Sequence, residues 1–454
     1  MPAVLAVIAV FVRMPTFLST RALSFDDGVY GASVVDMRRG LLPYRELFSS
    51  QGPLHLPLLY VGDIIGLHTI DGPRVTPVLA GVAVTIAVWA SARRLGARPP
   101  VALVAGVLIA TTGTMLWTTG QITGDGPAAA LTALAVWAAL CYRDWPRLTT
   151  ALLAGALFGA ALATKPIVIA AVVPLGAWLA CRRRTEHVVA ACGAALGVWL
   201  GAALPWGLAR VWQQSVEYHE RTGPSYSHLF QLQKLFSTVV TRDAVILAAV
   251  LLGVVAAYRA REKASSDTIV LTIWLVLAGL VLVFERAMFA NHVAAFVLPL
   301  VLLVAVRPPP LRWLALGLII LVPWELVNQR DILWPSHATG VDSQVEAALR
   351  ALPAGAEAIA DDPGLVWRAG RATPAQMNDT TDMRVFQGSI TTRTVAVAAA
   401  SPRNCAVVVT PGGWGVQLAG LRPALEADGY ALAHAYRDAT HARDLWLRTD
   451  CSPG

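Results

Sequence analysis

Two adjacent carboxylates stand near the start of a chain that is otherwise mostly apolar. They are Asp26 and Asp27, and the loop around them spans residues 24–30. Burial raises the pKa of a carboxyl group, so an Asp in a hydrophobic setting can accept a proton near neutral pH. The pair therefore indicates a general base. The alternative is that one of the two acids only caps the helix that follows.

The composition places these acids in a membrane protein. The sequence has 454 residues, of which 56% are hydrophobic and only 14% charged, with a mean hydropathy of +0.57. A soluble protein of this length needs more charge to cover its surface. The net charge of +7 fits arginine-rich cytoplasmic loops better than a nucleic-acid partner.

Apolar stretches of near-spanning length recur along the chain and predict about eleven transmembrane helices. The first stretch is short and contains Arg13, as expected of a helix whose N-terminal part lies outside this sequence. The predicted helices lie near 2–18, 73–92, 99–119, 126–141, 148–163, 166–181, 188–208, 243–258, 268–284, 292–306 and 313–327.

Basic residues are concentrated in alternate short loops, and this bias predicts the orientation of a multi-pass protein of the cell membrane. The cytoplasmic set comprises loops 93–98, 143–147, 182–184, 259–263 and 307–312. The first loop, 19–72, then lies outside the cytoplasm, together with the 209–242 loop and everything after about residue 328.

The chain changes character after the last apolar stretch. Short β-type runs alternate with helical patterns, which predicts a small extracytoplasmic α/β domain over 335–454 beside a transmembrane domain over 1–330. Cys405 and Cys451 would face an oxidising compartment, where they either pair or remain free thiols. The pairs Asp361-Asp362 and Asn378-Asp379 are interpreted as turn residues, although they could touch an acceptor.

Further polar residues fall at the same predicted face as the acid pair. Asp125 precedes the fourth helix, Lys165 ends the fifth and His292 enters the tenth. One Lys or His at a helix end is usually an anchor at the membrane surface. Several such residues beside two acids favour a shared site.

The first loop also contains an amphipathic stretch, residues 31–40, which suits a helix lying in the membrane interface. In the 209–242 loop, aromatic and charged residues are mixed. They could stack on sugars, but an interfacial helix with Trp and Tyr at the headgroup level is favoured.

The order of short motifs in the first loop resembles the GT-C superfamily of integral membrane glycosyltransferases, in particular the bacterial aminoarabinose-transferase and protein O-mannosyltransferase (family 39) type. The features near 125, 165 and 292 resemble later motifs of the same enzymes. The matching residues in the first loop are Asp26-Asp27, Tyr30, Gly40 to Glu46, and Gly52-Pro53-Leu54.

The resemblance implies a GT-C-like fold and inverting transfer of a sugar from a polyprenyl-phosphate donor to a cell-envelope acceptor. Asp26 would be the catalytic base, and Asp27 would orient Asp26 or the acceptor. Asp125 would bind the sugar or place the acceptor, and Tyr30 matches an aromatic residue of the motif. The residues expected to contact the donor phosphate are Arg45, Lys165 and His292.

Two departures from the family pattern bear on the substrates. The second acid is Asp27 rather than Glu, and Gln51 stands where some relatives carry a Lys that contacts the lipid phosphate. Gln51 cannot neutralise a charge, so Arg45 or Lys165 must do so. We expect no cofactor; a divalent metal held by the acid pair and Asp125 is a less favoured alternative.

Three rival functions stay open. The acceptor could be a protein hydroxyl, as in protein O-mannosyltransferases, rather than a glycan or lipid. The chain could be a polytopic transporter or flippase, although transporters place ionisable groups near mid-membrane and often contain repeated halves. It could also be a non-catalytic envelope-assembly protein whose acids only cap helices.

Overall fold

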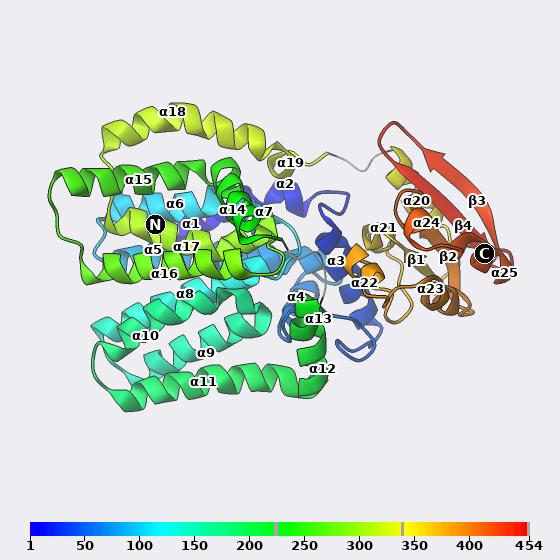
Figure 1. The fold of residues 1–454 in the computed structure, drawn as a ribbon, viewed down its shortest axis with the longest axis horizontal. Coiled ribbons are helices and arrows are strands. Elements are labelled where there is room, and N and C mark those ends of the chain that lie inside the picture. Colours follow the sequence, from blue (N-terminus) through cyan, green and yellow to red (C-terminus); the bar gives the residue numbers. More distant parts are fainter. Residues whose placement is uncertain (222–225, 337–339, 452–454) are drawn as a thin grey trace.

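The computed structural model describes residues 1–221, 226–336 and 340–451. It consists of a long helical bundle with a smaller α/β part at one end (Figure 1). Residues 222–225 of the predicted 209–242 loop lie outside the described residues. So do residues 337–339 and 452–454 of the predicted C-terminal domain.

The bundle is built from apolar helices that run nearly along one direction (Figure 1). Its core is rich in alanine and leucine, and glycines let neighbouring helices approach closely. These helices are α1 (Pro2–Phe11), α5 (Val75–Arg94), α6 (Pro99–Thr111), α7 (Gly113–Gly120), α8 (Asp125–Asp144), α9 (Leu148–Thr164), α10 (Val172–Ala180), α11 (Thr185–Ala203), α15 (Ala244–Arg259), α16 (Ser266–Phe284), α17 (Ala294–Val306) and α18 (Leu311–Asn328).

The bundle has the length and composition of a membrane domain. All eleven predicted stretches are largely helical. Within the described residues, four helices are long and apolar enough to cross a membrane, or up to six if each of two bent pairs is one span. Shorter apolar helices make up the rest, so the number of eleven spans stays a prediction. The four long helices are Gly72–Arg94, Asp125–Asp144, Thr185–Trp206 and Ser266–Phe284.

Shorter elements connect the bundle to the α/β part and surround the end of the bundle that faces it (Figure 1). They are α2 (Met14–Phe17), α3 (Phe25–Arg38), α4 (His55–Ile65), η1 (Gly72–Arg74), η2 (Pro166–Ala171), η3 (Leu204–Trp206), α12 (Leu208–Trp212), η4 (Gln213–Glu217), α13 (Tyr218–Arg221), α14 (His228–Arg242), η5 (Ala290–Val293) and α19 (Arg330–Leu333).

Helix α3 covers most of the stretch 31–40, for which an interfacial helix is predicted, and its position relative to the membrane surface stays a prediction. It begins at Phe25 and is buried over most of its length between the bundle and the α/β part. A Cβ on Gly31 would lie 2.2 Å from the Trp367 ring, and one on Gly28 would lie 2.5 Å from the Gly364 nitrogen. The small residues of α3 therefore let the C-terminal part of the chain pack against the helix backbone.

The α/β part contains a four-stranded sheet in the order β1-β2-β4-β3. Strands β1 and β2 are parallel, whereas β4 pairs antiparallel with both β2 and β3. The strands are β1 (Glu357–Ala360), β2 (Asn404–Val409), β3 (Tyr430–Arg437) and β4 (Ala442–Arg448). The helices are α20 (Gly340–Arg350), α21 (Pro363–Arg368), α22 (Asp382–Phe386), α23 (Thr392–Ala399), α24 (Trp414–Gln417) and α25 (Leu421–Ala427).

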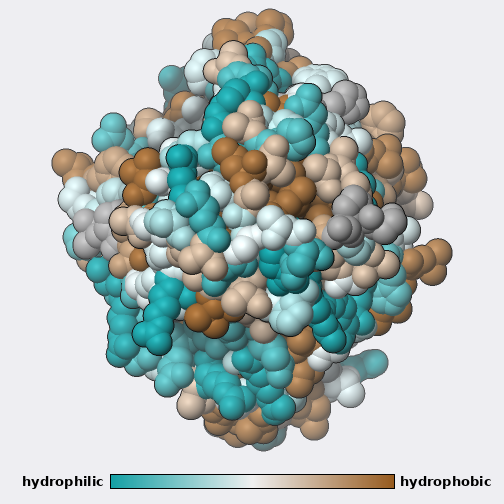
Figure 2. Space-filling model, turned by 90° about the vertical axis from the view of Figure 1, so that its right-hand side faces the viewer, coloured by the Kyte–Doolittle hydropathy of each residue, from teal (hydrophilic) through white to brown (hydrophobic). Residues whose placement is uncertain are grey.

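Two apolar clusters stabilise this sheet, one on each face. Helices α20 and α21 contribute to one cluster, and α23, α24 and α25 contribute to the other. Cys405 in β2 forms a disulfide with Cys451 just after β4, which resolves the question left open by the sequence. Seen end-on, the face around this part mixes hydrophilic side chains with scattered apolar ones (Figure 2).

Candidate active site

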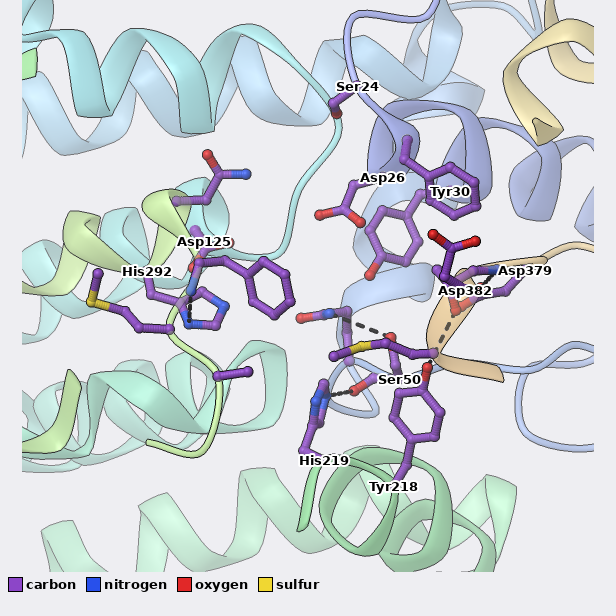
Figure 3. A pocket seen from close by; sticks show the side chains of 18 of the residues that line it. Ser24, Asp26, Tyr30, Ser50, Asp125, Tyr218, His219, His292, Asp379 and Asp382 are labelled. Atoms are coloured by element: carbon purple, nitrogen blue, oxygen red, sulfur yellow. Dashed lines mark hydrogen bonds between the residues drawn. The ribbon is translucent and has the colours of Figure 1, made fainter. Parts of the chain in front are cut away.

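A cavity of about 660 Å³ lies where the bundle meets the α/β part (Figure 3). Its walls come from α3, the loop that precedes α4, the ends of α8 and α9, the segment around α13, and η5. Loops and the short helices α22 and α24 of the C-terminal part close it. The cavity brings together six of the eight residues predicted for the site, which are Asp26, Tyr30, Gln51, Asp125, Lys165 and His292.

Asp26 lies in the first turn of α3 and points into this cavity (Figure 3). Ser24 is the N-cap of the helix and accepts a hydrogen bond from the Asp27 nitrogen, so Asp26 is not needed as a cap. Its carboxyl group receives no hydrogen bond from any described residue. Burial raises its pKa to about 6, and Asp125 and Asp379 add to this while Lys165 and His292 oppose it. Asp26 is therefore a carboxyl group without a hydrogen bond from any described residue, and its pKa lies close to neutral pH.

Asp27 does not line the cavity. Its Oδ2 lies 2.7 Å from Arg74 Nη2 and accepts from the Leu23 nitrogen, and its Oδ1 accepts from the Ile122 nitrogen. Both the Asp27 and Arg74 side chains are fully buried. Asp27 therefore fastens the start of α3 to η1 and to the loop before α8.

Asp125 and Lys165 form an ion pair at the bundle side of the cavity, with 2.7 Å between Oδ2 and Nζ. Asp125 occupies the first turn of α8, where the helix dipole favours a negative charge. Lys165 follows the last turn of α9, and Pro166 ends that helix because it cannot continue the hydrogen-bond ladder. The start of α8 and the end of α9 thus place opposite charges next to each other in the cavity wall.

The segment before α4 fits against the end of α9. The nitrogens of Gly52 and Leu54 donate to the carbonyls of Thr164 and Ala163, which satisfies orphan groups at the helix end. A Cβ on Gly52 would lie 2.3 Å from the Ala163 oxygen, so only glycine fits there. This contact places Gln51 beside Lys165 in the cavity wall.

Tyr30 is buried one turn after Asp26, and its ring meets the His55 ring edge-on with 4.5 Å between centroids. Its side chain points toward Ser50 (Figure 3). The Ser50 carbonyl accepts a hydrogen bond of 2.8 Å from His219 Nε2. Aromatic and polar side chains thus share this wall, which suits a ligand with both apolar and hydroxyl surface.

His292 lies on the opposite side, in η5, with its Nδ1 2.8 Å from Glu285 Oε2. It also borders a second cavity of about 560 Å³, which shares Gln51 and Lys165 with the first. The second cavity runs between η2 and α16, where Ile169 and Phe284 are exposed. The polar site therefore continues into an apolar opening on the side of the bundle.

Arg45 does not reach either cavity. Its Nη2 donates to the Pro205 carbonyl at 3.2 Å on the surface, and its own carbonyl accepts from Gln376. Of the three residues predicted to contact the donor phosphate, Lys165 and His292 line the cavity and Arg45 does not.

The cavity also contains residues that the sequence analysis did not favour. Tyr218, His219 and Lys234 come from the 209–242 segment, for which an interfacial position was preferred. Asp361 and Asp379, interpreted as turn residues, also line the cavity. Their chain positions carry no motif, so spacing alone gave no signal that they join the site.

No group of three or more His, Cys, Asp or Glu side chains is arranged to hold a metal ion among residues 1–221, 226–336 and 340–451. Asp26 and Asp125 face the same space, but Asp125 is occupied by Lys165. The expectation that the protein needs no cofactor, with a metal as the less favoured alternative, stays a prediction.

Comparison with known proteins gives one match in sequence. Residues 53–206 match the family of dolichyl-phosphate-mannose-protein mannosyltransferases, a region that includes Asp125 and Lys165 but not Asp26. A search of curated proteins finds no significant match.

Solved structures match over the whole chain. ArnT from Cupriavidus metallidurans has a TM-score of 0.66 at 14% identity, covering 98% of this chain and 97% of that one. The same enzyme bound to undecaprenyl phosphate matches equally well, over 100% and 99%. The oligosaccharyltransferase AglB from Archaeoglobus fulgidus matches at 0.53 and 14% identity, covering 100% of this chain and 75% of AglB.

A third similar structure is the arabinofuranosyltransferase AftD from Mycobacteria, with a TM-score of 0.54 at 15% identity over 100% of this chain and 42% of AftD. These matches confirm the resemblance to GT-C glycosyltransferases and show that the chain shares their fold.

Proposed function

We propose that this chain is a membrane glycosyltransferase that moves a sugar from a polyprenyl-phosphate donor to an acceptor hydroxyl, with Asp26 as the general base. The observation that carries the proposal is the free Asp26 carboxyl group, which faces the Lys165 cation across a cavity that opens into an apolar channel. Base, phosphate-binding cation and lipid access then lie in one continuous site.

The donor occupies both cavities in this proposal. Its polyprenyl chain leaves along Ile169 and Phe284, and its phosphate lies beside Lys165, where the two cavities join. Arg286 also lines the second cavity and adds a cation at the same entrance. ArnT, which has the same fold, has been solved with undecaprenyl phosphate, and this supports a lipid phosphate as the donor carrier.

The reaction is a single displacement. Asp26 removes the proton from the acceptor hydroxyl as the oxygen attacks the anomeric carbon, and the bond from that carbon to the phosphate oxygen breaks. The polyprenyl phosphate leaves with the electron pair of that bond, and Lys165 stabilises its negative charge. Attack opposite to the leaving phosphate inverts the anomeric centre.

Asp27 acts as a positioning residue in this scheme. Its ion pair with Arg74 fixes the first turn of α3 and therefore the direction in which Asp26 points. Asp125 positions Lys165 in a similar way, because its carboxylate holds the ammonium group at the cavity wall. The geometry of the reaction then depends on two buried acids that do not exchange protons.

We place the cavity on the extracytoplasmic side of the membrane. Arg94, Arg143 and Arg307 belong to the predicted cytoplasmic loops. They form ion pairs with Asp144, Asp267 and Glu262 at the end of the bundle opposite the α/β part. The excess of basic residues at that end supports the assignment.

The test uses the purified full-length protein in lipid nanodiscs. A panel of undecaprenyl-phosphate sugars is mixed with a cell-envelope extract as acceptor source, and labelled product and released undecaprenyl phosphate are measured. We expect release with at least one donor and none with the Asp26→Asn variant. Vesicle uptake of a substrate with no donor consumed would instead identify a transporter, and would overturn the proposal.

A further inference from the structure

The cavity is divided by charge. The bundle side contributes Lys165, Lys234 and His292, together with Asp125, which is paired with Lys165. The side formed by the C-terminal part contributes Asp361, Asp379 and Asp382. Among the described residues, that part contributes no Lys, Arg or His to the lining. In Figure 3, Asp379 and Asp382 lie across the cavity from His292 and Asp125, with Asp26 between the two sides. We name Asp361, Asp379 and Asp382 the acidic wall.

Backbone donors fix two members of the acidic wall, Asp361 and Asp379, whereas Asp382 is an exposed side chain. Asp361 accepts from the Thr410 nitrogen at 2.7 Å and from its hydroxyl at 2.9 Å, so its carboxyl group is fixed at the end of β1. Asp379 is 3% exposed and accepts from the Thr381 nitrogen. Asp382 is exposed and accepts from Gln417 Nε2 at 3.0 Å.

Two arginines lie behind this wall without entering the cavity. Arg384 donates to the Gln376 and Asp379 carbonyls, and Arg443 donates to the Thr410 hydroxyl and to Asp362. Arg384 Nη1 and the Arg443 guanidinium are thus bound to protein groups, and neither arginine lines the cavity. A ligand in the cavity meets carboxylate oxygens, which accept hydrogen bonds and repel anions.

Aromatic rings stand beside these acceptors. Tyr30 and Tyr218 border the same space, and Trp414 lies close to the wall in the C-terminal part. Carboxylates that accept from hydroxyls, next to rings that cover C–H surface, are the groups that suit a sugar.

We propose that the acidic wall binds the acceptor, and that this acceptor is an uncharged glycan rather than a phosphorylated molecule. The inference rests on the proposed function and adds a substrate class to it. The donor phosphate occupies the cationic side beside Lys165. The acceptor enters on the opposite side, where its hydroxyls donate to Asp379 and Asp382 and the attacking hydroxyl lies against Asp26. A phosphate on the acceptor would lie among like charges there.

The experiment compares acceptors that differ in one charged group. Methyl glycosides of common hexoses and pentoses, and the same glycosides carrying a phosphate monoester, are offered with the undecaprenyl-phosphate donor that the protein consumes. We expect the neutral acceptor to be preferred by about ten-fold or more in kcat/KM, because like charges across a binding site disfavour association. A peptide with serine and lysine is included as a cationic acceptor.

Variants connect this preference to the wall. Asp382→Asn should raise the acceptor KM for the neutral glycoside, leave the donor KM unchanged and reduce discrimination against the phosphorylated one. Asp379→Asn tests the same expectations at a buried residue of the wall. Asp428→Asn, in the same part of the chain but outside the cavity, should change none of these values.

Two kinds of result would overturn the inference: preferred use of the phosphorylated glycoside or the peptide, or unchanged discrimination in both wall variants. Binding of the same glycosides without donor is measured by thermal shift. This measurement tests the acidic wall independently of sugar transfer. Glycoside binding that is weakened by Asp382→Asn, with no donor consumed, would support the wall and refute the transferase. Transfer to phosphorylated acceptors only would support the transferase and refute the role of the acidic wall.

Discussion

Arg74 Nη2 and Asp27 Oδ2 lie 2.7 Å apart in a fully buried ion pair, while the neighbouring Asp26 faces the cavity with no hydrogen bond from any described residue. Consecutive residues on a helix point about 100° apart, so two adjacent acids can serve two different environments. One acid stabilises the structure and the other is available for chemistry. The first predictions separate these roles.

Asp26→Asn should abolish sugar transfer, with a loss of about 10²–10⁴-fold in kcat, because an amide cannot accept the proton from the acceptor. The fold should be unaffected, since the carboxyl group has no described hydrogen-bond partner to lose. Donor turnover and the thermal unfolding midpoint of the variant are measured together. Transfer at the wild-type rate would refute the assignment of the base.

Asp27→Asn should act mainly on stability. Removing Asp27 leaves the buried Arg74 with only its longer, 3.5 Å ion pair to Asp71, and loss of a buried partner costs about 3–5 kcal/mol. Thermal unfolding in detergent should therefore show a large drop that Asp26→Asn does not show. The double variant Asp27→Asn/Arg74→Met should recover part of the loss, and strict additivity of the two single changes would argue against the pair.

Transfer should depend on pH through Asp26. Burial raises the pKa of its carboxyl group to about 6. The base must be ionised, so activity should be full above this value and fall as the pH drops through it. Lys165 lowers this pKa and Asp379 raises it. The acid limb should therefore move to higher pH in Lys165→Met and to lower pH in Asp379→Asn. A limb that stays in place in both variants would exclude Asp26 as its source.

Gly31→Ala should separate the C-terminal part from α3. The new Cβ would lie 2.2 Å from the Trp367 ring, too close for the two elements to remain in place. We expect reduced transfer and faster proteolysis between the two parts. Gly193→Ala is the matched control, because a Cβ there meets open space in the middle of α11. Equal effects of the two substitutions would contradict this contact.

Lys165→Met should raise the donor KM, because the leaving phosphate loses its cation. The change also leaves Asp125 buried without its partner, so stability should fall. Lys165→Met/Asp125→Asn removes both charges and should restore stability but not donor affinity. Restored donor affinity in the double variant would place the phosphate elsewhere.

Much of this site was predictable because it lies at helix ends. Asp125 and Lys165 flank apolar stretches on one predicted face, and the fold brings them to 2.7 Å. The strands β1, β2 and β4 also coincide with the β-type runs of the sequence. Strand β3 was missed because its mostly apolar residues do not alternate with polar ones, and most of them are exposed.

The remaining parts depend on contacts between distant segments, which spacing does not encode. His219 reaches the cavity through its hydrogen bond to Ser50, 169 residues earlier in the chain. Asp379 is a residue type that is common in turns. Only the docking of the C-terminal part against α3 brings it to the cavity that contains Asp26. Arg45 matched a motif by order but points to the surface, because a motif does not fix the direction of a side chain.

The docking of Gly28 and Gly31 against Gly364 and Trp367 has a consequence for biogenesis. The acidic wall that closes the cavity is synthesised more than three hundred residues after Asp26. Until then the docking face of α3 has no partner. The cavity around Asp26 is therefore incomplete until the C-terminal part has been synthesised and has docked against α3.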